Sequence, residues 1–272
     1  MSQHVYFIGG GNMATAIIRA SLANQTLTAA QVTVTDIRTD RVQFLNNTYD
    51  LQASERLDKD FISEADIVVL AVRPQDDLAS IGAFIHENIQ HTTTLLSIVA
   101  GVTIHQLENY IGKKEQPVVR IIPNTLTDTG YGYSGVALNA YAEKETVESF
   151  LEGFGKIQYI DESLIDVFTG FGVAGPNYVY YFIESLVDGG VLAGLTREQA
   201  WEVTLDNLLG SVAMLKKSKL HPRQLMDINN SPGGVGIHLL HELNASDFAA
   251  GLQRSVLSAV ETTTRLGDSS QK

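Results

Sequence analysis

The sequence predicts an α/β domain with a parallel sheet, followed by an all-α domain. Five short β-rich runs occupy the first half, each separated from the next by a segment long enough for a crossover. After about residue 160 the pattern changes to long amphipathic stretches. Three consecutive glycines directly follow the first run and indicate a specialised turn from strand to helix. We therefore expect domains at residues 1–160 and 161–272.

The five predicted strands are mostly apolar at every position rather than at alternate ones, as in the run DIVVLAV. Such runs are typical of strands covered on both faces, which is the situation in a parallel sheet. The spacing indicates βαβ units, so we expect an open, doubly wound sheet. The predicted strands are Val5–Ile8, Val32–Thr35, Ile67–Val72, Leu95–Val99 and Val118–Ile122.

The second half contains only helical patterns, including a capping box from Thr196 to Gln199. Residues 167–183 contain no charged residue, and the length of this segment is at the lower limit for a membrane span. The Gly-Pro-Asn in the middle of this segment favours a helix buried in a core or a subunit interface instead. The predicted helical stretches are Ser163–Leu192 with a Gly-Pro break, Thr196–Lys216, His221–Ile228, Gly234–Leu243 and Asp247–Leu266.

The composition limits the classes of partner. The chain has 272 residues, is 44% hydrophobic and carries a formal net charge of −12. This charge would repel nucleic acid and an anionic membrane surface, so we expect neither as a partner. The sequence contains no cysteine and no signal-type leader, so we expect a cytoplasmic protein.

The motif Gly9-x-Gly11-x-x-Ala14 lies between a predicted strand and a predicted helix. This is the context of a dinucleotide fingerprint, in which the first glycine permits the turn and the second lets the backbone approach a pyrophosphate. The small third residue allows close packing of helix on strand, and the helix N-terminus binds the negative charge. The alternative is a glycine-rich turn that binds no ligand.

An acidic residue ends the second predicted strand. Asp36 lies 22 residues after Ala14, where a carboxylate can accept hydrogen bonds from an adenosine ribose and would repel a 2′-phosphate. Arg38 and Arg41 follow and could instead bind that phosphate, or could be solvated surface residues. We expect NAD(P)H as cofactor, with a lean towards NADH.

Six segments in the same order resemble pyrroline-5-carboxylate reductases, along essentially the whole chain. They are FIGGGNMATAI (Phe7–Ile17), ADIVVLAVRPQ (Ala65–Gln75), SIVAGVTIHQL (Ser97–Leu107), VVRIIPNT (Val118–Thr125), GPNYVYYFIESLVDGGVLAGLTREQA (Gly175–Ala200) and HPRQLMDINNSPGG (His221–Gly234).

The resemblance implies a Rossmann-type dinucleotide-binding domain and an all-α dimerisation domain that interlocks with a second chain, in a homodimer or a higher oligomer. A cyclic imine carboxylate, most simply pyrroline-5-carboxylate, would receive a hydride from NAD(P)H to give proline. The resemblance also implies where the cofactor would bind. The pyrophosphate would lie on Gly9, Gly11, Asn12, Met13 and Ala14. The adenosine would lie near Ala71, Val72 and Pro74, with Arg73 replacing the usual lysine, and the nicotinamide would lie near Pro123 and Asn124.

The substrate carboxylate would bind where SPGGVG opens a helix, since free backbone N–H groups gather at a helix N-terminus. The family has two threonines after Ser-Pro-Gly-Gly, but Val235 and Gly236 stand there in this chain, so a hydroxyl expected beside the imine nitrogen is missing. Restoring both threonines should raise turnover if pyrroline-5-carboxylate is the substrate. The expected substrate residues are Asn177, Ser231, Gly233, Gly234, Val235 and Gly236.

These departures leave other functions open. The chain could reduce a different imine, or could be a regulatory paralogue that binds dinucleotide without catalysis. No catalytic residue is assigned. His238 is a candidate proton donor, and His238 with His241 lacks the carboxylate-rich ligand set that a metal site needs, so we expect no metal.

Overall fold

The computed structural model describes residues 3–269, which form two compact units. The first unit comprises residues 3–173 together with 259–269, and the second is Ala174–Ser258. Within the described residues, no helix is long and apolar enough to cross a membrane.

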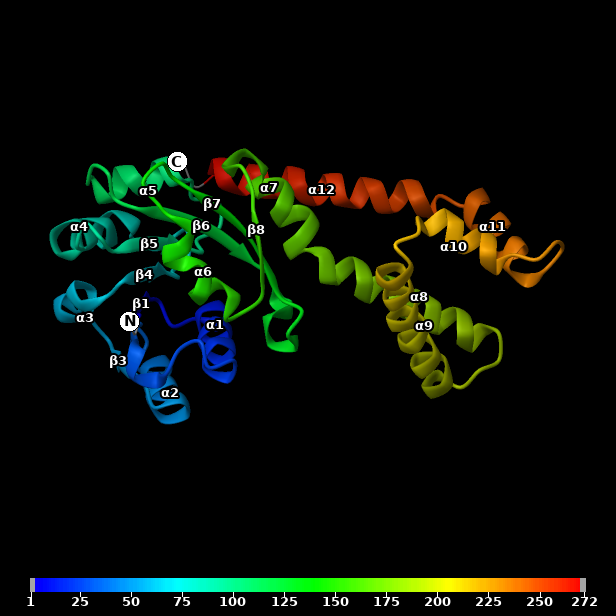
Figure 1. Ribbon diagram of the computed structural model, residues 1–272, viewed down its shortest axis with the longest axis horizontal. Helices are drawn as coiled ribbons and strands as arrows, with labels where there is room; N and C mark the ends of the chain where they lie inside the picture. The colour runs from blue at the N-terminus through cyan, green and yellow to red at the C-terminus, as the bar shows by residue number, and fades with distance from the viewer. Residues whose placement is uncertain (1–2, 270–272) are drawn as a thin grey trace. The chain divides into compact units, whose positions relative to one another are not determined.

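The first unit is built on an eight-stranded sheet with the order β3-β2-β1-β4-β5-β6-β7-β8 (Figure 1). All neighbouring strands are parallel except β6 and β7, which are antiparallel. The strands are β1 (Val5–Ile8), β2 (Val32–Thr35), β3 (Gln52–Ser54), β4 (Ile67–Leu70), β5 (Thr94–Ser97), β6 (Val118–Pro123), β7 (Tyr133–Leu138) and β8 (Lys156–Tyr159).

Helices cover both faces of this sheet, and each face has its own hydrophobic core. One core is shared with α1, α2 and α6, and the other with α3, α4, α5 and α7. Central strands such as β1 and β4 therefore contribute alternate side chains to opposite cores, which explains their continuous apolar sequence. The helices are α1 (Asn12–Ala23), α2 (Thr39–Tyr49), α3 (Lys59–Glu64), α4 (Leu78–Asn88), α5 (Ile104–Ile111), α6 (Lys144–Glu152) and α7 (Ile165–Phe168), with 3₁₀ turns η1 (Ala29–Gln31), η2 (Thr125–Thr129) and η3 (Glu162–Leu164) and the π-helical turn η4 (Thr169–Val173).

The second unit is helical. Helices α8 and α9 form a hairpin in which Gly190 lies against Ala200, with 2.8 Å between the position of a Cβ built on Gly190 and the Ala200 Cβ. The capping box predicted at Thr196 and Gln199 is present at the start of α9. The helices are α8 (Gly175–Leu192), α9 (Arg197–Ser218), α10 (Pro222–Asn229) and α11 (Val235–Ala245), and α12 (Phe248–Ser269) begins in this unit and ends in the first.

The compact units divide the chain differently from the expected boundary at residues 160 and 161. Residues 161–173 pack on the sheet. Ile165 is fully buried, and the rings of Phe168 and Tyr133 of β7 meet edge to face, with 5.8 Å between their centroids. The end of α12 returns to the same unit, where a Cβ on Gly170 would lie 2.6 Å from the backbone nitrogen of Val260. A glycine at 170 therefore permits close contact between two backbones.

Candidate functional site

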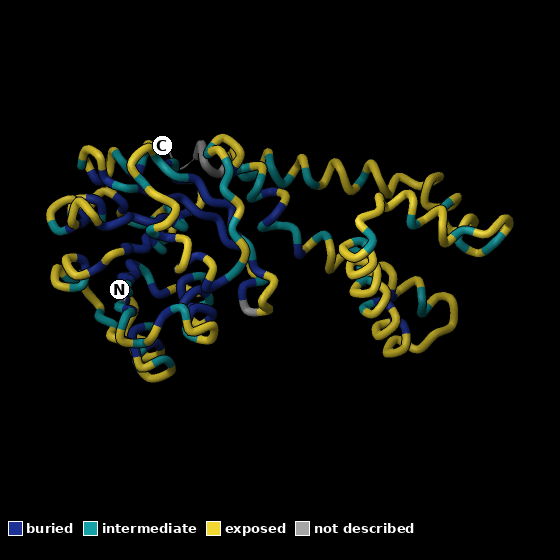
Figure 2. The backbone as a smooth tube through the Cα atoms, in the orientation of Figure 1, coloured by how far each residue is buried: buried dark blue, intermediate teal, exposed yellow. Residues whose placement is uncertain are grey.

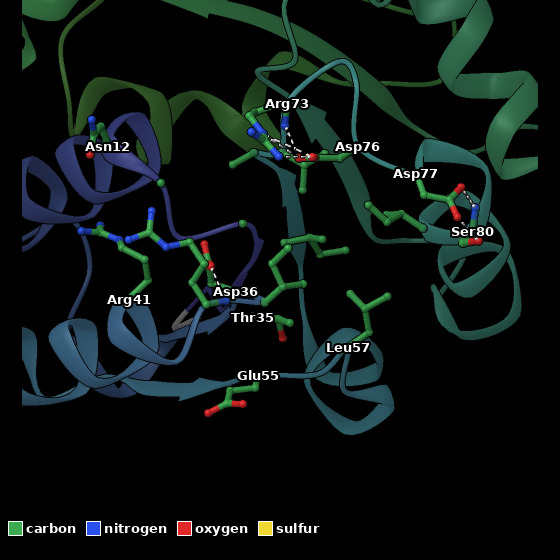
Figure 3. A pocket seen from close by; sticks show the side chains of 18 residues that line it. Asn12, Thr35, Asp36, Arg41, Glu55, Leu57, Arg73, Asp76, Asp77 and Ser80 are labelled. Carbon is green, nitrogen blue, oxygen red and sulfur yellow. Dashed lines mark hydrogen bonds and ion pairs between the residues drawn. The ribbon is translucent and has the colours of Figure 1, made fainter.

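A cavity of about 660 Å³ opens at the carboxyl ends of β1, β2 and β4 (Figure 3). In the sheet order, β1 lies between β2 and β4, and the chain crosses to opposite sides of β1 in forming them. Ligands of open α/β sheets bind at this type of switch point. Of the predicted cofactor residues, those lining the cavity are Gly9, Gly11, Asn12, Asp36, Arg38, Ala71 and Val72.

Gly9 is required by the fold itself. Its φ of +104° is in a region that side chains rarely adopt, and its N–H donates to the Thr35 carbonyl at 2.7 Å. A Cβ at this position would lie 2.5 Å from the carbonyl oxygen of Ala71. Gly9 therefore lets three strands meet at one turn.

Gly11 has a different role. It is the N-cap of α1 with an ordinary φ of −66°, and no side chain caps the helix there. A Cβ built on Gly11 would meet no atom within 4 Å. The free N–H groups of the first turn of α1 thus face open space beside a positive helix end, which suits a pyrophosphate.

Two backbone N–H groups fix the carboxylate of Asp36. Oδ2 accepts from Gly10 N at 2.8 Å, and Oδ1 accepts from Arg38 N at 2.9 Å. Each carboxylate oxygen retains a further lone pair for a ligand hydroxyl. The position directly after β2 therefore carries a fixed negative charge at the cavity wall.

The two arginines beside Asp36 already have partners. The Arg38 guanidinium makes a two-point ion pair with Asp40, which lowers the pKa of the Asp40 carboxyl. Arg41 donates Nε and Nη2 to the carbonyl of Gly10, at 3.0 and 2.7 Å, and its guanidinium lies 4.8 Å from the centre of the Phe44 ring.

The opposite wall comes from the segment between β4 and α4. Arg73 donates Nη2 to Oδ1 of Asp76 at 2.8 Å and its backbone N–H to Oδ2 at 2.8 Å, and these bonds lower the pKa of Asp76 (Figure 3). Asp77 caps α4 by accepting from Ser80 N at 3.0 Å. Asp76, Asp77 and Ser80 also line the cavity but were not predicted from the sequence. They follow the predicted strand Ile67–Val72, and this position at a strand end could have indicated them.

Several predicted cofactor residues do not line the cavity. Ala14 is buried in the core between α1 and the sheet, and Met13 packs against the same core. Pro74 follows the lining residue Arg73 but does not itself line the cavity. Met13 and Ala14 belong to the first turn of α1, and Pro74 belongs to the segment between β4 and α4. The side chains of Met13 and Ala14 pack between helix and sheet, and their backbone N–H groups lie in the first turn of α1, so their contact with a pyrophosphate stays a prediction.

Pro123 ends β6 and Asn124 is the N-cap of η2; both are buried, outside the cavity. Asn124 Oδ1 accepts from the backbone N–H groups of Leu126 and Tyr133, each at 3.2 Å. Its Nδ2 has no hydrogen-bond partner among residues 3–269. The side chain thus stabilises a turn through its oxygen, and both N–H donors of Nδ2 lack a partner among the described residues.

The predicted substrate residues belong to the second unit. Gly233 has a φ of +68°, and Gly234 caps α11 through its backbone, with its N–H donating to the Ser231 carbonyl at 3.0 Å. The side chain of Val235 is exposed, and Asn177 is exposed in the first turn of α8. The first N–H groups of α11 therefore have no side-chain cap.

The histidines of this unit have separate surroundings. His221 caps α10, with its Nδ1 accepting from Arg223 N at 3.2 Å, and His238 and His241 are exposed. In the part of the chain that the structure describes, no three His, Asp or Glu side chains converge into a metal site.

Two families match parts of the chain. Residues 162–266 match the family described as pyrroline-5-carboxylate reductase dimerisation, and residues 4–101 match the family described as NADP oxidoreductase coenzyme F420-dependent.

Relatives match over the full length. The chain is 30% identical to pyrroline-5-carboxylate reductase of Synechocystis, covering 98% of this chain and 99% of the relative. It is 31% identical to the Arabidopsis thaliana protein of that name, covering 97% and 96%.

Solved structures of similar proteins have the same fold. A pyrroline-5-carboxylate reductase from Coxiella burnetii aligns with a TM-score of 0.87 at 26% identity, covering 98% of this chain and 99% of that one. Pyrroline carboxylate reductase of Plasmodium falciparum, solved with NADP bound, aligns with a TM-score of 0.84 at 29% identity, covering 97% and 98%.

Proposed function

This chain belongs to the pyrroline-5-carboxylate reductase family, and we propose that it reduces pyrroline-5-carboxylate to proline with NAD(P)H. The observation that carries the proposal is the cavity at the β1 switch point, with an uncapped helix at one side and a fixed carboxylate at the other. When bound, the nicotinamide supplies the hydride, and the protein binds and orients the reactants.

The residues of the cavity fit a dinucleotide. The N-terminus of α1 and the open space at Gly11 suit a pyrophosphate, because a Cβ there would extend into that space. The fixed oxygens of Asp36 suit the hydroxyls of an adenosine ribose.

For the imine, we propose the loop Ser231–Gly236 together with Asn177. A substrate carboxylate would accept hydrogen bonds from the free N–H groups at the start of α11, where the helix dipole also favours an anion. The protein would thereby hold the imine carbon at a fixed orientation for hydride transfer. Few charged side chains are needed for such a step.

We further propose that NADH is preferred over NADPH. A 2′-phosphate would approach the carboxylate of Asp36, and both neighbouring arginines are committed to other acceptors, Arg38 to Asp40 and Arg41 to the Gly10 carbonyl. A phosphate that bound either arginine would compete with these acceptors for the guanidinium.

The assembly that we propose is a homodimer formed through residues 162–266, the segment that matches the dimerisation family. The exposed apolar side chains of the second unit support it, since a partner surface would remove them from water. A cytoplasmic location stays a prediction from the sequence.

The test is the oxidation of NADH and of NADPH by the purified protein with pyrroline-5-carboxylate, followed by nicotinamide absorbance. We expect turnover of at least about one per second, with a higher kcat/KM for NADH. Asp36→Ser should shift the ratio of kcat/KM values towards NADPH by on the order of 10-fold. The control Asp58→Ser, at the half-buried N-cap of α3 outside the cavity lining, should leave the ratio unchanged.

Turnover with neither nucleotide, alongside measurable dinucleotide binding, would contradict the proposed reaction and favour another imine or a regulatory role. If the protein used both nucleotides equally and Asp36→Ser did not change this, the proposed role of Asp36 in nucleotide preference would be wrong, while the proposed reaction would stand.

A further inference from the structure

The side chain of Asn230 occupies the space in front of Gly236. A Cβ built on Gly236 would lie 2.1 Å from Asn230 Oδ1 and 3.3 Å from its Cγ. No real Cβ tolerates such a separation, so a residue larger than glycine fits at 236 only if the Asn230 carboxamide moves. The identities of these two residues are therefore sterically coupled.

Asn230 is held where α10 ends. It is the C-cap of that helix, and its backbone N–H donates to the Asp227 carbonyl at 3.3 Å. Six residues later Gly236 lies in the first turn of α11. The end of α10 thus places Asn230, and its carboxamide lies beside the uncapped start of α11.

The carboxamide is half-buried and makes no side-chain hydrogen bond to any described residue. It retains one acceptor oxygen and two N–H donors for a ligand. The neighbouring Val235 cannot replace it, because that side chain is 88% exposed and apolar. Asn230 is therefore the polar side chain that fills the space beside Gly236.

We propose that Asn230 is a substrate-specificity residue of this loop: its carboxamide takes the position that a side chain at 236 would occupy, and Oδ1 accepts a hydrogen bond from the N–H of the protonated imine. This inference rests on the proposed function. It also changes an expectation from the sequence, because Gly236→Thr cannot simply restore a hydroxyl while Asn230 stands in front of it.

The experiment is a double-mutant cycle with Asn230→Ala and Gly236→Thr, measured as kcat/KM for pyrroline-5-carboxylate. Asn230→Ala should lower kcat/KM by on the order of 10- to 100-fold, as expected when a substrate N–H loses its acceptor. Gly236→Thr alone should also lower it, because the new side chain displaces the carboxamide. The double variant should be more active than either single variant, since the threonine then has room and supplies a hydroxyl.

Asn229→Ala is the matched control, since Asn229 is the adjacent exposed asparagine. It should leave kcat/KM nearly unchanged, and all variants should keep the NADH affinity and the melting temperature of the parent protein. A loss confined to imine turnover separates contact with substrate from a merely structural role.

Two results would overturn the proposal while leaving the reaction intact: Asn230→Ala as active as Asn229→Ala, or a double variant that multiplies the losses of the single ones. No turnover in the unaltered protein would overturn the proposed function itself, and this role of Asn230 with it.

Discussion

The two units differ in how far their residues are buried (Figure 2). In the sheet unit, both faces of the strands are covered and the core residues are almost fully buried. In the helical unit, Val187 and Ala200 are the buried hydrophobic residues among those described, while Leu192 is 89% exposed and Leu209 is 69% exposed.

This difference concerns what each unit needs in order to be stable. The sheet unit buries its own apolar surface, which is the main favourable contribution to folding. The helical unit leaves large apolar side chains in water, an arrangement typical of a surface that a partner covers. Because its sequence matches a dimerisation family, the partner is another copy of the chain in a homo-oligomer.

The largest expected effect comes from a charge in the exposed apolar surface of the helical unit. Leu209→Asp should abolish assembly, because an uncompensated carboxylate would be buried in the interface. The helices should then lose stability, while the sheet unit keeps its fold. Sedimentation measures assembly, and the fluorescence of Trp201, the single tryptophan, reports on α9.

Tyr141→Asp is the control, since Tyr141 is 50% exposed on the sheet unit. It should change neither sedimentation nor Trp201 fluorescence. If Leu209→Asp sedimented like the parent protein, this face of α9 would not be an interface, and the comparison of the two units would lose its explanation.

A smaller effect separates folding from binding within the sheet unit. Gly9→Ala should reduce the free energy of unfolding by about 2–4 kcal/mol, because it combines a strained φ with a Cβ that meets the Ala71 carbonyl. Gly11→Ala should lower the free energy of unfolding by only about 1 kcal/mol, the cost of alanine at an N-cap, since its Cβ meets nothing. It should weaken NADH binding at least about 10-fold by filling the space for the pyrophosphate.

Chemical denaturation followed by circular dichroism measures the first quantity, and fluorescence titration with NADH measures the second. Unchanged NADH affinity in Gly11→Ala would show that the dinucleotide does not approach this turn. Neither variant should alter the assembly of the helical unit.

The sequence predicted the parts of the sheet unit that have strong apolar runs. All five predicted strands are present, with differences of one or two residues at some ends. The three strands that it missed have weaker patterns. β3 (Gln52–Ser54) has only three residues and lies at a sheet edge, β8 alternates polar and apolar residues at the other edge, and β7 contains Gly135. Pairing with a neighbour, rather than local preference, makes these segments strands.

The candidate site was predicted where a motif fixes the backbone and missed where side chains meet through space. Gly9, Gly11 and Asp36 were identified because turn, helix start and strand end follow one another in the chain. The contact of Asn230 with Gly236 could not be predicted, because it depends on the angle at which α11 follows α10. The ion pairs of Arg38 with Asp40 and of Arg73 with Asp76 could not be predicted either, because they depend on side-chain rotamers.

The smallest expected effect concerns a tyrosine in the sheet unit. Tyr6 is fully buried in β1, and burial raises its pKa above the ordinary value of 10.0, although the hydrogen bond with Thr35 Oγ1, at 2.8 Å, opposes this. The native state therefore favours the neutral phenol. Its contribution to stability is complete below the unfolded pKa, about 10, and is lost as the pH rises through the higher folded pKa.

Tyr6→Phe should lower the free energy of unfolding by about 1 kcal/mol at pH 7, because the hydrogen bonds of the hydroxyl with Thr35 Oγ1 and the Asp58 N–H are lost. It should also flatten the fall of this free energy between about pH 9 and 11. Tyr181→Phe, at a tyrosine 80% exposed in the helical unit, should leave that slope unchanged. Denaturation followed by circular dichroism at each pH gives the slopes. Equal slopes for Tyr6→Phe and the parent protein would mean that alkaline unfolding of the sheet unit starts elsewhere, whereas a flatter slope would locate it in the core that distinguishes this unit from the helical one.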